Sequence, residues 1–329
     1  MAAVIILESD RLRITVNPLV GGTITAIEHL ELGKSVLGTV PWTTESTPLD
    51  PATVRDEPIW LTRFTGGWPI LFPNGGDACT FRGVFHGFHG EGSIAPWDMQ
   101  TDQSRLFLRR RFTTVPVEME REIALDGDLL TIRETARVLG SESATVMWGH
   151  HPSFGSDLLE GPVEIQSSAR GVMSDDHYDA AADPLRPGGK GRWPMVAGKA
   201  GPFDLSRPRE PVTAVACLHD FAGAWVTIRR LDNSVGVALS WDERVFPFAW
   251  LWFELGGRTA PPWNSRTRLI GVEPNTTWPA HGLAAAEERG GRLLTLVPGK
   301  DVTAWIRLQV FKPAGAVRGV EGDGRVIGL

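Results

Sequence analysis

The chain has 329 residues, of which 42% are hydrophobic and 22% are charged, and its formal net charge is −6. This size and composition allow a large buried core, and the mild acidity argues against a nucleic-acid partner, because such binding depends on Lys and Arg neutralising phosphates. The first residues lack the pattern of a signal peptide and no apolar stretch is long enough to cross a bilayer, so we expect a cytoplasmic protein without a membrane partner.

Alternating polar and apolar residues, which are typical of half-buried strands, recur at residues 11–16, 105–115, 129–135, 224–229 and 302–310. Gly and Pro, 37 and 24 in number, interrupt the sequence often and leave room for only one short helix, at residues 282–289. Many short strands separated by turns predict an all-β protein built as a large antiparallel β-sandwich. No shift in composition divides the chain, so we expect a single domain of residues 1–329.

One long segment, residues 179–209, is rich in Pro, Gly, Lys and Arg. This composition predicts a surface loop. The rim of a binding site is the alternative, because long loops in compact domains are often functional.

Histidines gather in two short segments, residues 84–97 and 147–155, and a third segment places Glu273 at the end of an apolar run. His89 is followed by Gly, which favours backbone that turns tightly or lets a ligand approach closely. His150 and His151 are adjacent, so on a strand they would point to opposite faces and only one would face a given site. A carboxylate inside an apolar run is costly unless it is paired or used, although each of these features alone is more often structural.

Neither a metal nor a cofactor is predicted. His86 with His89, or His89 with His151 and Glu273, could make a two-His, one-carboxylate set, but the spacings match no compact metal motif. Nucleophile-elbow and P-loop motifs are missing from the sequence. The cysteines Cys79 and Cys217 form no CxxC pair, and we expect both thiols to be reduced.

Taken in order, residues 89–97, 149–154 and 271–274 resemble three motifs of the aldose 1-epimerase, or galactose mutarotase-like, family. These motifs are a His in an HG…W stretch, a His in a GHHPxF stretch, and a late Glu in an LEP-like stretch. Residues 17–22 and 69–74 also resemble the family's opening strand and the segment before its first His. The stretch around residues 248–257 is similar to a branch whose substrate is not settled.

The resemblance implies a galactose mutarotase-like supersandwich with an open sugar-binding cleft, and an enzyme that interconverts the α and β anomers of a free aldose without a cofactor. Opening a cyclic hemiacetal needs a base for the anomeric hydroxyl and an acid for the ring oxygen. By resemblance, Glu273 is the base, His151 is the acid and His89 hydrogen-bonds near the ring oxygen. The partner is then a small-molecule sugar, and we expect a monomer or a homodimer.

One departure from the family concerns the segment before the first His, where many members place an Arg that holds sugar hydroxyls. Here no Arg occurs until Arg82, so we expect Asn74 and Asp77 to bind the substrate instead. Trp97 and Trp252 are candidates for stacking on the sugar, with core packing as the alternative. Residues 175–177, which read Asp-Asp-His, are predicted to be a solvated loop.

Three other functions stay open. A phosphorylated sugar would require basic residues near the cleft, for which Arg63 and Arg82 are the candidates before the first His. A non-catalytic carbohydrate-binding or sensing module would not need an acid and a base. Because one fold can host many reactions, the third alternative is another carbohydrate-active enzyme, such as a lyase or a hydrolase. A hydrolase would use a second carboxylate, for which Glu91 and Glu254 are candidates.

Overall fold

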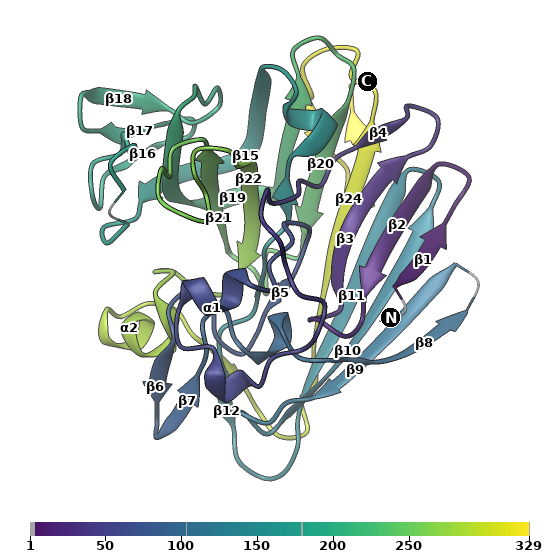
Figure 1. Ribbon diagram of the computed structural model, residues 1–329, viewed down its shortest axis with the longest axis vertical. Helices are drawn as coiled ribbons and strands as arrows, with labels where there is room; N and C mark the ends of the chain where they lie inside the picture. The colour runs from purple at the N-terminus through teal and green to yellow at the C-terminus, as the bar shows by residue number, and fades with distance from the viewer. Residues whose placement is uncertain (1–3, 103, 179, 329) are drawn as a thin grey trace.

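The computed structural model describes residues 4–102, 104–178 and 180–328. Within them, strands dominate and the named strands pair in antiparallel fashion, so the predicted all-β antiparallel architecture is confirmed. Figure 1 shows two regions of sheet joined by the strands that run between them, with two short helices at the lower left. That one domain spans residues 1–329 stays a prediction.

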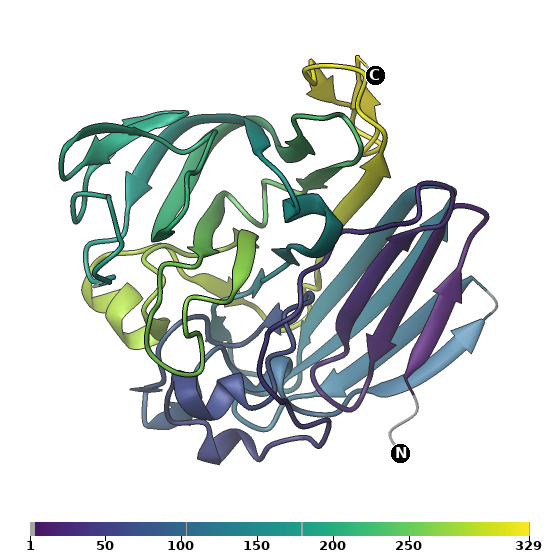
Figure 2. The same cartoon turned by 45° about the horizontal axis from the view of Figure 1, so that its top comes forward.

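The N-terminal sheet has four strands, namely β1 (Ile5–Glu8), β2 (Leu12–Asn17), β3 (Thr23–His29) and β4 (Lys34–Ser35). In β2 the side chains alternate, so that Leu12, Ile14 and Val16 are buried and their neighbours are partly exposed. These apolar side chains join Leu108 and Met119 of the large sheet in one core. Figure 2 shows this sheet lying as a layer over the strands β8 to β11.

The large sheet has sixteen strands, eleven of them in one path. From edge to edge this path is β18 (Gly201–Asp204), β17 (Met195–Gly198), β16 (Lys190–Arg192), β15 (Val163–Ser174), β19 (Val212–Arg230), β20 (Gly236–Trp241), β24 (Val302–Phe311), β11 (Leu129–Val138), β10 (Val117–Asp126), β9 (Arg105–Arg111) and β8 (Asp98–Asp102). The other five are β5 (Ile70–Leu71), β13 (Gly149–His150), β14 (Ser153–Phe154), β21 (Phe248–Leu255) and β22 (Arg268–Asn275).

Strand β19 changes its pairing partner along its length. Its first half, from Val212 to His219, pairs with β21, whereas its second half, from Trp225 to Arg229, pairs with β20. A register shift in the pairing with β15 accompanies this change of partner, as expected where a strand bends. Strands β21 and β22 therefore form a branch of the sheet that starts at the first half of β19 and lies off the main path.

Shorter elements complete the fold. Two hairpins are β6 (Cys79–Phe81) with β7 (Val84–His86) and β25 (Gly319–Val320) with β26 (Val326–Ile327), whereas β12 (Ala144–Val146) pairs with β23 (Leu294–Leu296) from a distant part of the chain. The helices are α1 (Glu57–Leu61) and α2 (Gly282–Glu288), with single 3₁₀ turns at Pro51–Thr53, Glu91–Ser93 and Ser156–Leu159. Asp56 caps α1 by accepting a hydrogen bond of 3.0 Å from the Ile59 amide. Among the described residues, no helix has the length and apolar character needed to cross a membrane.

The strands predicted from alternation correspond to β2, β9, β11, part of β19, and β24, and the predicted helix corresponds to α2. The segment 179–209 differs from its prediction as a loop. Apart from residue 179, which lies outside the described residues, it contains β16, β17 and β18, which extend the sheet beyond β15. Residues 180–209 do not form the rim of the site either, because none of them lines the cleft described below.

Candidate active site

One face of the β19–β21–β22 branch forms the floor of a cleft of about 330 Å³. Residues directly opposite each other on antiparallel strands point to the same face. Trp250 pairs with Glu273, and Trp252 pairs with both Val215 and Gly271. Val215, Trp250, Trp252 and Glu273 accordingly all line the cleft.

The pairing of β14 with β22 places His151, which precedes β14, in the same cleft. Ser153 of β14 pairs with Gly271, two residues before Glu273 in β22. His151 precedes Ser153 by two residues, and its Nδ1 lies 3.0 Å from the Ser153 Oγ. Its other ring nitrogen, Nε2, lies 3.5 Å from Glu273 Oε1. His150, by contrast, points away into the core, as the alternation predicts.

His89 enters the cleft from a tight turn in the loop after β7. Its φ is 56°, a left-handed conformation that is unusual for a residue with a side chain, and Gly90 follows with φ 76°. The Gly76 amide donates a hydrogen bond of 2.9 Å to His89 Nδ1. The neutral ring therefore carries its proton on Nε2. Among the described residues this Nε2–H has no hydrogen-bond partner, so it is available to a ligand.

The electrostatics of the three groups follow from burial. Burial raises the pKa of Glu273 well above its usual value, and among the described residues its carboxyl accepts no hydrogen bond. Burial lowers the pKa of His151 to about 4. Burial, and then the neighbouring His151, lowers the pKa of His89 well below its usual value. Burial therefore favours the neutral form of both imidazoles and disfavours the charged form of the Glu273 carboxyl.

Aromatic side chains form the walls around these groups. The Trp60 ring lies 4.7 Å from the His89 ring, and the Phe64 and Trp252 rings lie 5.5 Å and 5.3 Å from the His151 ring, measured between centroids. Flat apolar walls with a few convergent polar groups are typical of small-molecule sites. The predicted position of Trp252 beside a ligand fits this arrangement, because Trp252 lines the cleft.

A charged cluster closes one side of the cleft mouth. His281 Nδ1 lies 3.0 Å from Asp77 Oδ2, and His281 Nε2 lies 2.9 Å from the carboxylate of Asp175. Burial alone would lower the pKa of His281, but the hydrogen bonds and charges of Asp175 and Asp77 raise it to about 9. His281 is thus a cation that joins the end of β15 to the loops before β6 and before α2. Asp77, which is predicted to bind the substrate, lines the cleft, and its carboxylate is paired with this histidine.

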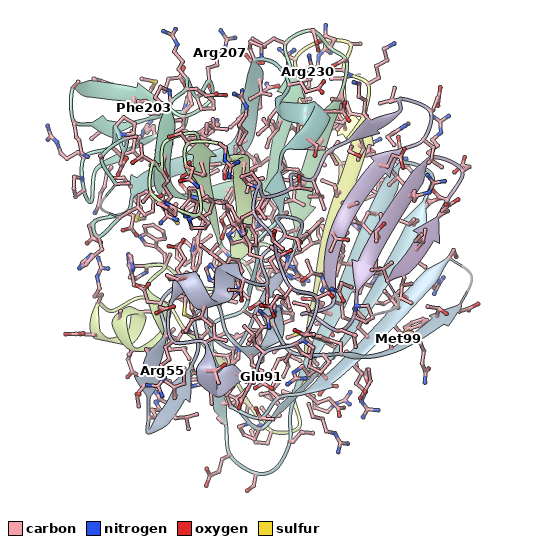
Figure 3. The ribbon with its side chains drawn as sticks, in the orientation of Figure 1. Arg55, Glu91, Met99, Phe203, Arg207 and Arg230 are labelled. Atoms are coloured by element: carbon pink, nitrogen blue, oxygen red, sulfur yellow. The ribbon has the colours of Figure 1, made fainter. Side chains whose placement is uncertain are left out.

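On the other side, Arg258 lines the cleft with its guanidinium group held in place. Its Nη1 donates a hydrogen bond of 2.6 Å to Glu57 Oε1 at the start of α1, and the guanidinium carbon lies 4.8 Å from the centre of the Trp263 ring. A second arginine, Arg55, also lines the cleft, and Figure 3 shows it beside the β6–β7 hairpin.

Two predicted substrate-binding residues do not line the cleft, and both expectations are corrected. Asn74 is fully buried, and its side chain donates to the carbonyls of Asp77 and Gly87 and accepts from the Leu283 amide, at 2.8, 3.0 and 2.9 Å. It therefore holds loops together and has no group left for a sugar. Trp97 is buried in the core, where its Nε1–H donates to the Gly92 carbonyl at 3.2 Å.

The residues considered for other chemistries also lie outside the cleft lining. Glu91 is buried among the hydrogen-bond donors of Thr113, Thr114 and Arg110. Glu254 accepts a hydrogen bond of 3.1 Å from the Arg258 amide. His86, Arg63 and Arg82 do not line the cleft either, the last two being paired with Glu45 and Glu287.

One group of side chains at the rim has the composition of a metal site. Ligand atoms of Asp176, His177 and His281 lie within 4.8 Å of one another. These atoms are already engaged, because Asp176 pairs with Arg289 and with His177, and both nitrogens of His281 face carboxylates.

The roles of Asp175 and His281 were not predicted from the sequence. Asp175, predicted to lie in a solvated loop, has a side chain only 2% exposed and lines the cleft. His281 is followed by a Gly, as His89 is, and this shared pattern was a usable signal. Nothing in the sequence indicated that Arg258 and Glu57 would meet.

Solved structures share this architecture over nearly the whole chain. The Slr1438 protein from Synechocystis sp. PCC 6803 is 20% identical, with a TM-score of 0.67 over 95% of this chain and 97% of that one. A galactose mutarotase-like protein from Lactobacillus casei ATCC 334 is 15% identical, with a TM-score of 0.63 over 94% and 100%. An aldose epimerase homologue from C. elegans is 12% identical, with a TM-score of 0.62 over 95% and 99%.

No protein-family model matches the sequence, and no curated protein matches it either. At the identities of the solved structures, the likeness shows the fold alone. The predicted galactose mutarotase-like fold is thereby confirmed.

Proposed function

We propose that this chain, which has the galactose mutarotase-like fold, is an aldose 1-epimerase-like isomerase that interconverts the α and β anomers of a free sugar. The observation that carries the proposal is the convergence of His89, His151 and Glu273 in one aromatic-walled cleft. A hemiacetal opens when one group takes the proton of the anomeric hydroxyl and another protonates the ring oxygen. Glu273 is the base, His151 is the acid, and the Nε2–H of His89 holds the ring oxygen.

Glu273 and His151 share one exchangeable proton in this mechanism. The raised pKa of Glu273 and the lowered pKa of His151 favour the proton on the carboxyl rather than on the imidazole. Transfer of that proton to His151 Nε2, 3.5 Å away, produces the carboxylate base and the imidazolium acid together. Ring opening leaves Glu273 with the proton of the anomeric hydroxyl and transfers the proton of His151 to the ring oxygen. Rotation about the C1–C2 bond, followed by reclosure with the reverse proton transfers, gives the other anomer.

The charges of the cleft favour an uncharged sugar over a phosphorylated one. Of the cations that line it, Arg258 is paired with Glu57, and His281 is paired with Asp175 and Asp77. A phosphate would have to displace one of these carboxylates or lie close to it, which costs electrostatic free energy. Arg55 is the remaining cation of the lining, and the acid Asp56 is next to it in the chain.

The proposal is tested by measuring anomer exchange of a panel of free aldoses and their 6-phosphates with NMR, after subtraction of the uncatalysed rate. We expect acceleration with at least one free aldose and a smaller effect on its phosphate. A sugar that binds, shown by chemical-shift changes, without any acceleration would instead support a carbohydrate-binding module.

A further inference from the structure

A second cavity lies beside the cleft. We call it the outer groove; its volume is about 850 Å³ and its lining includes His177, Ala285, Glu288 and Arg289. The last three come from α2 and the residue after it, at spacings of three and four residues that bring them to one face of the helix. In Figure 1, α2 lies at the lower left, on the same side as the β6–β7 hairpin.

The cleft and the outer groove are neighbours. Asp77, Tyr178, Arg258 and His281 line both cavities, so these four residues form the boundary that the two cavities share. His89, His151 and Glu273 line only the cleft. A ligand that occupied both cavities would therefore have its reacting end in the cleft and its remaining part in the outer groove.

The outer groove suits an uncharged, hydroxyl-rich group. Its cations are paired, because Arg289 bonds Asp176, Arg258 bonds Glu57, and His281 bonds Asp77 and Asp175. Hydrogen-bonding groups are nevertheless accessible, since the side chains of His177 and Asp77 are 63% and 62% exposed.

The cleft alone, at about 330 Å³, lies at the small end of the range of roughly 300–1,000 Å³ for small-molecule sites. From this size and the four lining residues that the two cavities share, we propose that the substrate is the reducing end of an uncharged disaccharide or longer oligosaccharide. The reducing ring occupies the cleft and the next sugar occupies the outer groove. This inference rests on the proposed isomerase function and names its substrate class.

The test compares kcat/KM for anomer exchange of cellobiose, maltose and lactose with that of glucose. We expect at least one disaccharide to be exchanged with a kcat/KM about tenfold or more above that of glucose, because contacts to one added group are typically worth that much. Ala285→Trp, which fills the outer groove, should lower the ratio of disaccharide to glucose kcat/KM by about the same factor.

Glu287→Trp is the matched control, because it adds the same ring to the same helix at a residue that lines neither cavity. It should leave the ratio unchanged. If glucose is exchanged but no disaccharide is exchanged faster, or if Ala285→Trp leaves the ratio as it was, the inference is overturned while the isomerase function stands. If neither glucose nor any disaccharide is exchanged, and a wider panel of aldoses also fails, the proposed function is overturned and this inference with it.

Discussion

Gly271 determines where the Glu273 carboxyl can lie. The two residues are two positions apart in β22 and so share a face of the sheet, and a Cβ built on Gly271 would lie 2.6 Å from Glu273 Oε1. No other residue type leaves this space open.

Gly271→Ala should therefore displace the carboxyl and lower kcat for anomer exchange by roughly 100-fold, because small misplacements of reacting groups have costs of this order. Gly319→Ala, where the added methyl would meet only the Ile327 Cδ1 at 3.5 Å, is the control and should be active. An active Gly271→Ala variant would show that the position of this carboxyl is not critical.

The pH dependence of kcat/KM tests the shared proton of His151 and Glu273. Below the His151 pKa of about 4 both groups are protonated and no base is left. Above the raised pKa of Glu273 neither group holds the exchangeable proton and no acid is left. We expect a bell-shaped profile with its acidic limb near pH 4 and its alkaline limb well above the ordinary carboxyl range. A kcat/KM that does not fall below pH 4, or an alkaline limb within the ordinary carboxyl range, would contradict this assignment.

Motif order in the sequence was enough to predict which three groups meet in the cleft, and it failed for Asn74 and Trp97. Motifs identify residue types at given positions, but the direction of a side chain depends on the tertiary contacts around it. Asn74 is turned inward by the amide of Leu283, 209 residues away, and such a partner leaves no local signal. The same holds for His281 and Asp175, which are 106 residues apart.

At the scale of elements, the long alternating strands were predictable and the short ones at the site were not. Strands β13 and β14 have two residues each, too few to show a period. Their register is imposed by pairing with β22, where Gly149 meets Asn275 and Ser153 meets Gly271. Strands β16 to β18 were missed because their Gly and Pro content resembles that of a loop.

His281 links three elements of the rim, so its charge should contribute to stability. Its folded-state pKa of about 9 exceeds the ordinary value of 6.5, so this contribution is fully present below about pH 6.5 and is lost as pH rises through 9. We expect His281→Ala to lower the free energy of unfolding by roughly 2 kcal/mol at pH 6 and by less at pH 10. Urea denaturation across this range measures both, and an equal loss at both pH values would contradict the charged state of His281.

At the scale of the whole molecule, a buried polar network joins the layers. Arg121 of β10 pairs with Glu134 of β11 at 2.9 Å, and Arg121 also donates to the Gly22 carbonyl of the N-terminal sheet at 3.1 Å. Glu134 accepts a hydrogen bond of 2.9 Å from Trp148 Nε1 and lies 2.9 Å from His150 Nε2. Burial alone would raise the pKa of Glu134, but His150, Arg121 and Trp148 together lower it.

Removing one member of this network should leave an uncompensated charge in the core. Glu134→Ala should lower the free energy of unfolding by about 3–5 kcal/mol, the usual cost of breaking a buried ion pair. Asp301→Ala, which breaks the exposed pair with Arg137, should cost less than about 1 kcal/mol. Chemical denaturation of the two variants side by side provides the measurement. Similar losses would mean that the buried pair contributes no more than a surface pair.

The overall architecture was predictable because many alternating strands without long helices leave few other solutions. The three solved structures compared above are only 12% to 20% identical to the chain, so the fold tolerates extensive change outside the pattern that specifies it. The reaction cannot be carried over by fold alone and depends on the groups in the cleft.

Whether Glu273 acts as an acid–base group on a bound sugar is decided by comparing the wild type with Glu273→Gln in anomer exchange by NMR. We expect the wild type to accelerate exchange and the variant, which keeps the shape of the side chain, to lose a factor of about 10²–10⁴ while its unfolding transition is unchanged. Equal acceleration by the two proteins would show that the Glu273 carboxyl takes no part in the reaction.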